Sequence, residues 1–167
     1  GLLGEVCYFE SHFDRYRPRI RDRWRERGGP GSGIWFDLGP HLLDQAICLF
    51  GLPVSMTVDL AQLRPGAQST DYFHAVLVYP QRRVILHATL LAAAETARFI
   101  VHGSRGSYIK YGLDPQEERL KNGERLPQED LGYDMRDGIL TRVDGEDRSE
   151  ESWLTLPGHY PAYYAAI

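Results

Sequence analysis

Cysteine is scarce in this sequence. The two cysteines, Cys7 and Cys48, lie far apart among apolar residues, and no Cys-x-x-Cys pair occurs. This excludes a disulfide framework and a zinc site built on paired cysteines. We expect both cysteines to be buried free thiols and the protein to be cytoplasmic.

Long hydrophobic runs are also missing. The longest apolar stretch, 84–94, carries a histidine within it, and it is shorter than the roughly 20 residues that a transmembrane helix needs. No segment has the pattern of a signal peptide, so we expect no membrane partner. The 167 residues, 43% of them hydrophobic, are enough for one domain with its own core.

The sequence has no excess of positive charge. Its 19 Lys and Arg stand against 23 Asp and Glu, whereas a dedicated nucleic-acid binder is usually basic. Arginine nevertheless fills every odd position from Arg15 to Arg27. Pro18 would interrupt a central strand in this segment, and a helix would scatter the arginines around its axis. Neither form gives one basic stripe, so we expect no nucleic-acid partner and mostly solvated or acid-paired arginines.

Alternation of apolar and polar residues is the strongest structural signal. It predicts strands at 5–13, 54–64, 72–80, 83–91, 97–103, 106–112 and 139–143. The short connections between them favour antiparallel neighbours. In the 83–91 strand, Val84 and Leu86 lie on one face while Ile85 lies on the other. Because both faces carry apolar residues, we expect the second face to meet another copy of the chain, in a homo-dimer or higher homo-oligomer.

Helices are few. One is predicted at 41–51, where apolar residues line one side and Gly51 ends the pattern. A short charged helix is expected at 115–122, another begins near Pro161, and the rest of 123–150 reads as exposed loops. The pattern predicts an α+β fold over residues 1–167, with a single large, mostly antiparallel open sheet and helices on one face.

Three ionisable residues follow the arginine segment at helical spacing. Asp37, His41 and Asp44 stand at i, i+4 and i+7, so in a helix they share one face. A carboxylate one turn from a histidine can orient its ring and stabilise the imidazolium, which suits a proton acceptor. Pro40 fits best in a first helical turn, with Asp37 near the helix start. The same spacing also fits a capping aspartate with an ordinary histidine, or a metal site.

The surroundings of these residues favour the catalytic interpretation. Trp24-Arg25, then a glycine-rich turn from Gly31, then Asp-x-Gly-x-His-x-x-Asp ending at Asp44, resembles the substrate domain of the glucose–fructose oxidoreductase/inositol dehydrogenase (Gfo/Idh/MocA) family. The following run of strands agrees with the C-terminal domain of that family. The resemblance covers nearly the whole chain, and the stretch from Gly31 to Asp44 is its most specific part.

The resemblance implies a second domain that this chain lacks. Family members hold NAD or NADP in an N-terminal Rossmann domain, which also supplies a lysine, usually in Glu-Lys-Pro. No Glu-Lys-Pro and no Gly-x-Gly-x-x-Gly occur here. The chain starts at Gly1 in strand-like sequence and stops where a helix begins. We therefore expect a fragment, inactive alone, of an oxidoreductase that acts on a sugar, cyclitol or related alcohol.

The resemblance also implies roles for individual residues. His41 would be the general base that takes the alcohol proton, and Asp37 would orient it. Asp44 would either support the site or lie on the helix surface. Pro40 stands where many relatives have an ordinary residue, which puts the details of the turn in doubt.

The substrate, a polyol or sugar, is predicted to meet Arg17, Trp24 and Arg25, because an arginine fork suits oxygen-rich or anionic groups. The plain alternative for these arginines is a surface loop without a ligand. Two other functions stay open: a stand-alone protein-interaction module, and a metal-dependent hydrolase or lyase that uses Asp37, His41 and Asp44.

Overall fold

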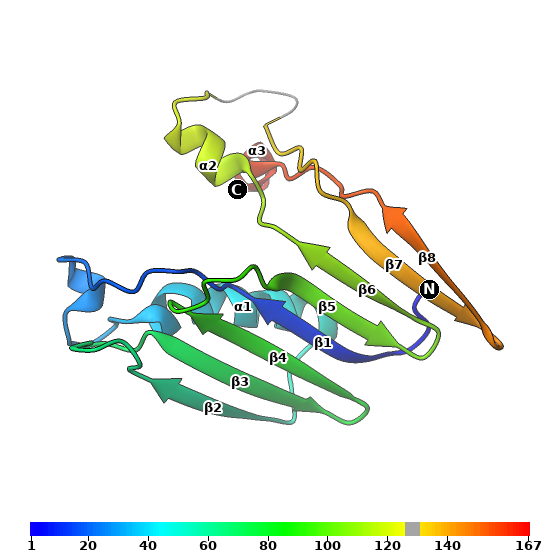
Figure 1. The fold of residues 1–167 in the computed structure, drawn as a ribbon, viewed down its shortest axis with the longest axis horizontal. Helices are drawn as coiled ribbons and strands as arrows, with labels where there is room; N and C mark the ends of the chain where they lie inside the picture. The colour runs from blue at the N-terminus through cyan, green and yellow to red at the C-terminus, as the bar shows by residue number, and fades with distance from the viewer. Residues whose placement is uncertain (126–130) are drawn as a thin grey trace.

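The computed structural model describes residues 1–125 and 131–167, which build one open sheet of eight strands (Figure 1). The strands are β1 (Val6–His12), β2 (Ser55–Ala61), β3 (Tyr72–Tyr79), β4 (Arg82–Thr89), β5 (Ala97–Gly103), β6 (Gly106–Tyr111), β7 (Gly138–Asp144) and β8 (Asp147–Trp153). Their order is β2-β3-β4-β1-β5-β6-β7-β8. Only β1 and β4 pair in parallel, so the predicted, mostly antiparallel open sheet of an α+β fold is confirmed.

The core lies between one face of this sheet and the long helix α1 (Ile34–Phe50). Alternate residues of the strands point to that helix, and Phe73, Leu77 and Leu86 are fully buried there. Leu42 and Ala46 of α1 are fully buried against them. Burial of apolar surface between helix and strands is therefore what positions α1.

Helix α1 begins earlier than the sequence predicts. It starts at Ile34 instead of 41, so Pro40 lies inside the helix and not in its first turn. Proline lacks the N–H that would donate to the carbonyl four residues back. The helix continues because Leu38 and Leu42, on either side of Pro40, are both buried under the sheet. Asp37 does fall in the first turn.

The second half of the chain contains one strand more than predicted. The strand expected at 139–143 is β7, but it forms a hairpin with β8, whose first residues fall in the 123–150 stretch predicted to be exposed loops. Residues 126–130 of the expected loop region lie outside the described residues. Helices α2 (Gln116–Lys121) and α3 (Tyr160–Ala165) match the two short helices expected. The expectation of buried thiols is wrong, because Cys7 and Cys48 are both exposed.

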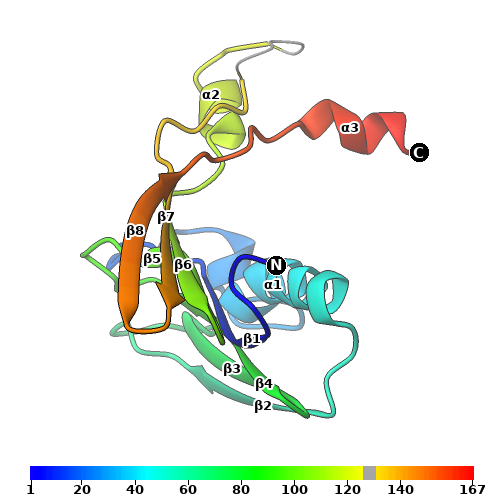
Figure 2. The same cartoon turned by 90° about the vertical axis from the view of Figure 1, so that its right-hand side faces the viewer.

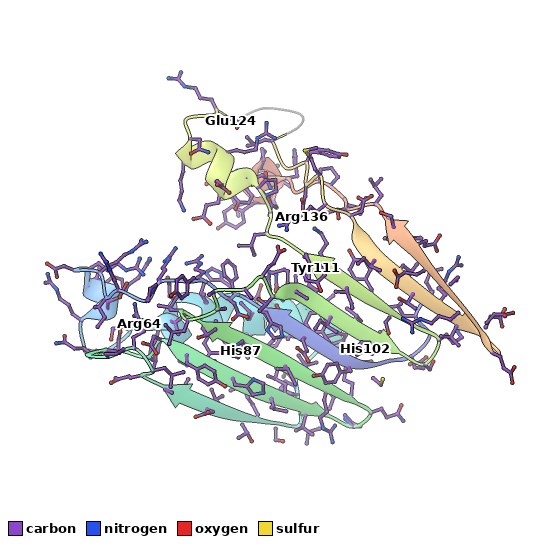
Figure 3. All side chains as sticks on the ribbon, in the orientation of Figure 1. Arg64, His87, His102, Tyr111, Glu124 and Arg136 are labelled. Atoms are coloured by element: carbon purple, nitrogen blue, oxygen red, sulfur yellow. The ribbon has the colours of Figure 1, made fainter. Side chains whose placement is uncertain are left out.

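The face of the sheet opposite α1 is open. In Figure 2, α1 lies on one side of the sheet, α3 extends on that same side, and α2 lies beyond the end of β6. No described helix covers the other face, which is turned toward the viewer in Figures 1 and 3. Ile85 and Thr89 are half-buried on it, opposite the buried Val84 and Leu86, as the alternation predicts. None of the described helices is both long and apolar enough to cross a membrane.

Candidate active site

The arginine segment lies beside the end of β4. The backbone N–H of Arg15 donates to the carbonyl of Thr89 at 2.9 Å, and that of Arg17 donates to the carbonyl of Leu90 at 2.7 Å. Tyr16 pairs with Leu91 in a single antiparallel bridge. The first residues of the segment therefore extend the sheet, before the chain turns into the short 3-10 helix η1 (Trp24–Glu26).

A buried arginine from outside the run holds this segment in place. Arg64 Nε donates to Asp71 Oδ2 at 2.9 Å, and its Nη1 donates to the carbonyl of Arg17 at 3.1 Å. The same Nη1 lies 3.0 Å from Glu26 Oε2. The side chains of Arg64 and Asp71 are each 1% exposed. A buried charge is tolerated when it is paired and hydrogen-bonded in this way.

Glu26 is the second anchor. Arg23 Nε donates to its Oε1 at 2.9 Å, and the backbone N–H of Arg21 donates to its Oε2 at 3.1 Å. Burial alone would raise the pKa of Glu26, but these bonds and the charge of Arg64 together lower it below its usual value. Of the seven arginines, Arg23 is thus paired with this acid through its side chain, as expected for acid-paired arginines, whereas Arg21 contributes only its backbone N–H.

Glycine is required where the loop joins α1. Gly33 has φ 91°, and a Cβ added there would lie 2.3 Å from Thr70 Oγ1. The close approach lets the N–H of Gly33 donate to the carbonyl of Arg25 at 2.8 Å, and that of Ile34 to the carbonyl of Thr70 at 2.7 Å. The start of α1 is thereby held against both the arginine loop and the chain that leads into β3.

These elements bring three predicted site residues together. Arg25 Nη1 lies 3.3 Å from Asp37 Oδ1, and Arg17 lines the same pocket. The full lining of the pocket is Arg15, Arg17, Arg23, Arg25, Glu26, Gly33, Ile34, Asp37, Arg64, Ser69, Thr70 and Leu90. Arg15 was not predicted, although its place in the run of arginines was a usable signal.

The pocket is positively charged. Burial lowers the pKa of Arg15, and burial together with the neighbouring arginines lowers that of Arg17. Arginine starts from so high a pKa that both stay charged at neutral pH. Within residues 1–125 and 131–167, neither has a carboxylate at ion-pair distance. Their donors are therefore available to an oxygen-rich or anionic ligand.

The other predicted residues do not line this pocket. His41 and Asp44 are exposed on α1 and do not line it. Trp24 is 62% exposed, and the guanidinium of Arg25 stacks 5.3 Å from its ring centroid. In the described residues, Asp37, His41 and Asp44 do not form a group that could hold a metal ion. The geometry of these three residues therefore gives no support to a metal site built on them.

The open sheet with one long covering helix defines the class of this chain: an α+β domain. A family model described as "Oxidoreductase family, C-terminal alpha/beta domain" matches residues 1–167. The chain therefore belongs to the Gfo/Idh/MocA oxidoreductase family.

Known proteins similar to this chain are oxidoreductases. Oxidoreductase YdgJ of Escherichia coli (strain K12) is 85% identical over 167 residues, which are 100% of this chain and 48% of YdgJ. The scyllo-inositol 2-dehydrogenase (NADP(+)) IolW of Bacillus subtilis (strain 168) is 36% identical over 169 residues, 100% of this chain and 47% of IolW. A solved oxidoreductase structure from Yersinia pestis superposes with a TM-score of 0.94 at 70% identity, covering 99% of this chain and 46% of that one. The chain spans about half the length of the curated relatives it matches.

Proposed function

We propose that this chain is the substrate-binding and oligomerising half of an NAD(P)-dependent oxidoreductase that acts on a sugar, cyclitol or related alcohol. The observation that carries the proposal is the contact of Arg25 with Asp37 at the start of α1, beside the unpaired donors of Arg15 and Arg17. Arginine forks can bind several oxygens of a polyol, a carboxylate or a phosphate. The name of IolW, which specifies a cyclitol and NADP(+), supports the substrate class and the cofactor.

The described residues do not fit a dinucleotide. The sequence has no Gly-x-Gly-x-x-Gly, and the one long helix among them, α1, follows a glycine loop after η1 instead of a strand. A Rossmann cradle needs a strand-to-helix turn at the pyrophosphate. NAD or NADP is therefore bound mainly outside this chain, and the chain alone is inactive.

The residues of this chain then have two tasks. The pocket beside Asp37 binds and orients the oxygens of the substrate. His41, one turn further along α1, accepts the proton of the alcohol hydroxyl that is oxidised. Asp37 acts on His41 through its charge, and Arg25 fixes the position of that charge.

The oligomer of this proposal forms through the open sheet face. Half-buried apolar residues such as Ile85 and Val76 lie on it without a covering element in the described part of the chain. A standard interface of roughly 1,600 Å² in total would cover such a face.

The test uses the whole oxidoreductase that carries this chain and a panel of sugars, cyclitols and sugar acids. We expect reduction of NAD or NADP with at least one of these alcohols, followed by the absorbance of the reduced nicotinamide. No turnover with any of them, in either direction and with either cofactor, would contradict the proposal. Saturable, tight binding of NAD(H) to the 167-residue chain alone would contradict the proposal that the cofactor is bound mainly outside this chain.

A further inference from the structure

A second cluster of ionisable residues lies on the open face, away from the Asp37 pocket. His12 of β1 and His87 of β4 are directly paired in the parallel register of the two strands. Both side chains lie on the face opposite the core, and their ring centroids are 5.2 Å apart. Asp14 follows β1 by two residues and lies between them. Figure 3 marks His87 on this face.

Asp14 is held firmly in this cluster. Its Oδ1 accepts the backbone N–H of Thr89 at 3.0 Å, and its Oδ2 accepts the hydroxyl of Thr96 at 2.9 Å. Its side chain is only 3% exposed. A carboxylate this buried needs a positive charge or strong donors close to it. Besides these two donors, Asp14 faces the two imidazoles and interacts electrostatically with Arg98.

The nitrogens of the two imidazoles lie slightly too far from the Asp14 carboxylate for good hydrogen bonds. His12 Nδ1 lies 3.4 Å from Asp14 Oδ2, and His87 Nε2 lies 3.5 Å from Asp14 Oδ1. These distances exceed a good hydrogen bond. In addition, His12 Nδ1, the nitrogen that faces Asp14, is buried without a hydrogen-bond partner among the described residues. The Nδ1 of His87 is also without a partner there, whereas the nitrogen of His87 that faces Asp14 is Nε2. Buried polar atoms without a partner call for an explanation, such as an ion.

The spacing fits a metal ion. Ligand nitrogens and oxygens lie about 2.0–2.2 Å from a tetrahedral zinc ion, so two such ligands are roughly 3.4 Å apart. One ligand atom from each of His12, Asp14 and His87 lies within 4.8 Å of the others. This is the only such group of three found in the described residues.

The groups behind the ligands also suit a metal. His12 Nε2 contacts Glu10 Oε2, which leaves Nδ1 as the nitrogen that faces Asp14. A carboxylate behind a ligating histidine fixes its ring and strengthens it as a ligand. The rings of Tyr72 and His74 pack against His87 at centroid distances of 5.2 and 5.6 Å and hold it in place.

We propose that His12, Asp14 and His87 bind a divalent transition-metal ion, with zinc as the best fit. Two imidazoles and one carboxylate are borderline ligands that suit zinc better than calcium or magnesium, which prefer oxygen. Three protein ligands leave a fourth position for water. The site lies on the opposite face of the sheet from the Asp37 pocket, so it is independent of the proposed reaction.

The experiment measures metal binding by the whole oxidoreductase after dialysis against a chelator. Zinc is titrated in competition with a chromophoric chelator, and cobalt(II) is added separately to record its visible spectrum. We expect one zinc per chain and the intense bands of tetrahedral cobalt(II). His87→Ala should weaken zinc binding by at least about 100-fold, and Glu10→Gln by roughly 10–100-fold.

His102→Ala is the matched control, because His102 lies on the same face but bonds to Ser107 Oγ at 2.7 Å, outside the cluster. It should bind zinc as the parent does. Equal zinc affinity in the parent and in a folded His87→Ala variant would overturn the proposal. If His87→Ala does not fold, the test rests on the parent protein. A parent that binds no stoichiometric zinc, or that gives an octahedral cobalt(II) spectrum, would equally overturn the proposal.

Discussion

Arg25 Nη1 lies 3.3 Å from Asp37 Oδ1, and this contact joins the arginine segment to the first turn of α1. The basic run and the start of the Asp-x-x-x-His motif thus lie in contact with each other. The buried Arg64 makes the contact precise, because it fixes the backbone of Arg17 and the side chain of Glu26 on the same loop.

His41→Ala should lower kcat of the whole oxidoreductase by roughly 10²–10⁴-fold and change KM little, since a general base acts mainly in the transition state. Asp37→Asn should give a smaller loss, because the imidazole stays while the orienting charge is removed. Steady-state kinetics checks both. A His41→Ala variant with near-normal kcat would reduce His41 to a helix-surface residue.

Arg25→Ala should raise KM for the substrate by about tenfold or more, because it removes a donor of the pocket and releases Asp37. Arg27→Ala is the matched control. Arg27 belongs to the same run but pairs with the exposed Asp22 at 2.5 Å and does not line the pocket. Its KM should match that of the parent. If both substitutions raised KM equally, substrate binding would depend only on the overall positive charge of the segment and not on a contact with Arg25.

Glu26→Gln should destabilise the folded protein by about 2 kcal/mol at pH 7, since hydrogen bonds to a charged group are lost. The pKa of Glu26 is lower in the folded state than its usual 4.5. Its stabilisation is therefore complete above pH 4.5 and is lost as the pH falls through the lower, folded-state pKa. Urea unfolding from pH 7 to pH 3 measures this. The gap between parent and variant should stay constant above about pH 5 and close below it; a gap independent of pH would refute the ionic role.

Alternation along the chain predicted most of the sheet, because strands with one buried face leave that pattern wherever α1 covers them. It could not predict β8 (Asp147–Trp153), whose residues are mostly polar and all exposed, so no buried face imposes alternation. Nor could it give the neighbours of β1, which pairs with β4 more than 70 residues further along. That pairing is what brings His12 beside His87.

The sequence indicated which residues belong to the candidate site better than it indicated how the fold brings them together. The motif pointed to Asp37, and the run of arginines supplied Arg17 and Arg25. Arg64 stands alone in the loop after β2, and no pattern marks it as the residue that anchors the site. Its role follows from long-range contacts with Asp71, Glu26 and the carbonyl of Arg17, which a single sequence does not encode in any local spacing.

The open face of the sheet is the surface through which we propose that the subunits associate. Ile85→Asp would place a charge at the centre of the proposed subunit contact, on the face that no described helix covers. Burying an unpaired carboxylate there costs several kcal/mol, so the oligomer should dissociate to monomer in sedimentation velocity. Leu49→Asp is the matched control, because Leu49 is 61% exposed on α1, on the other side of the sheet. It should leave the oligomer intact. A parent that sediments as a monomer at high concentration would refute the proposed oligomer. An Ile85→Asp variant that stays oligomeric while Leu49→Asp dissociates would assign the contact to another surface.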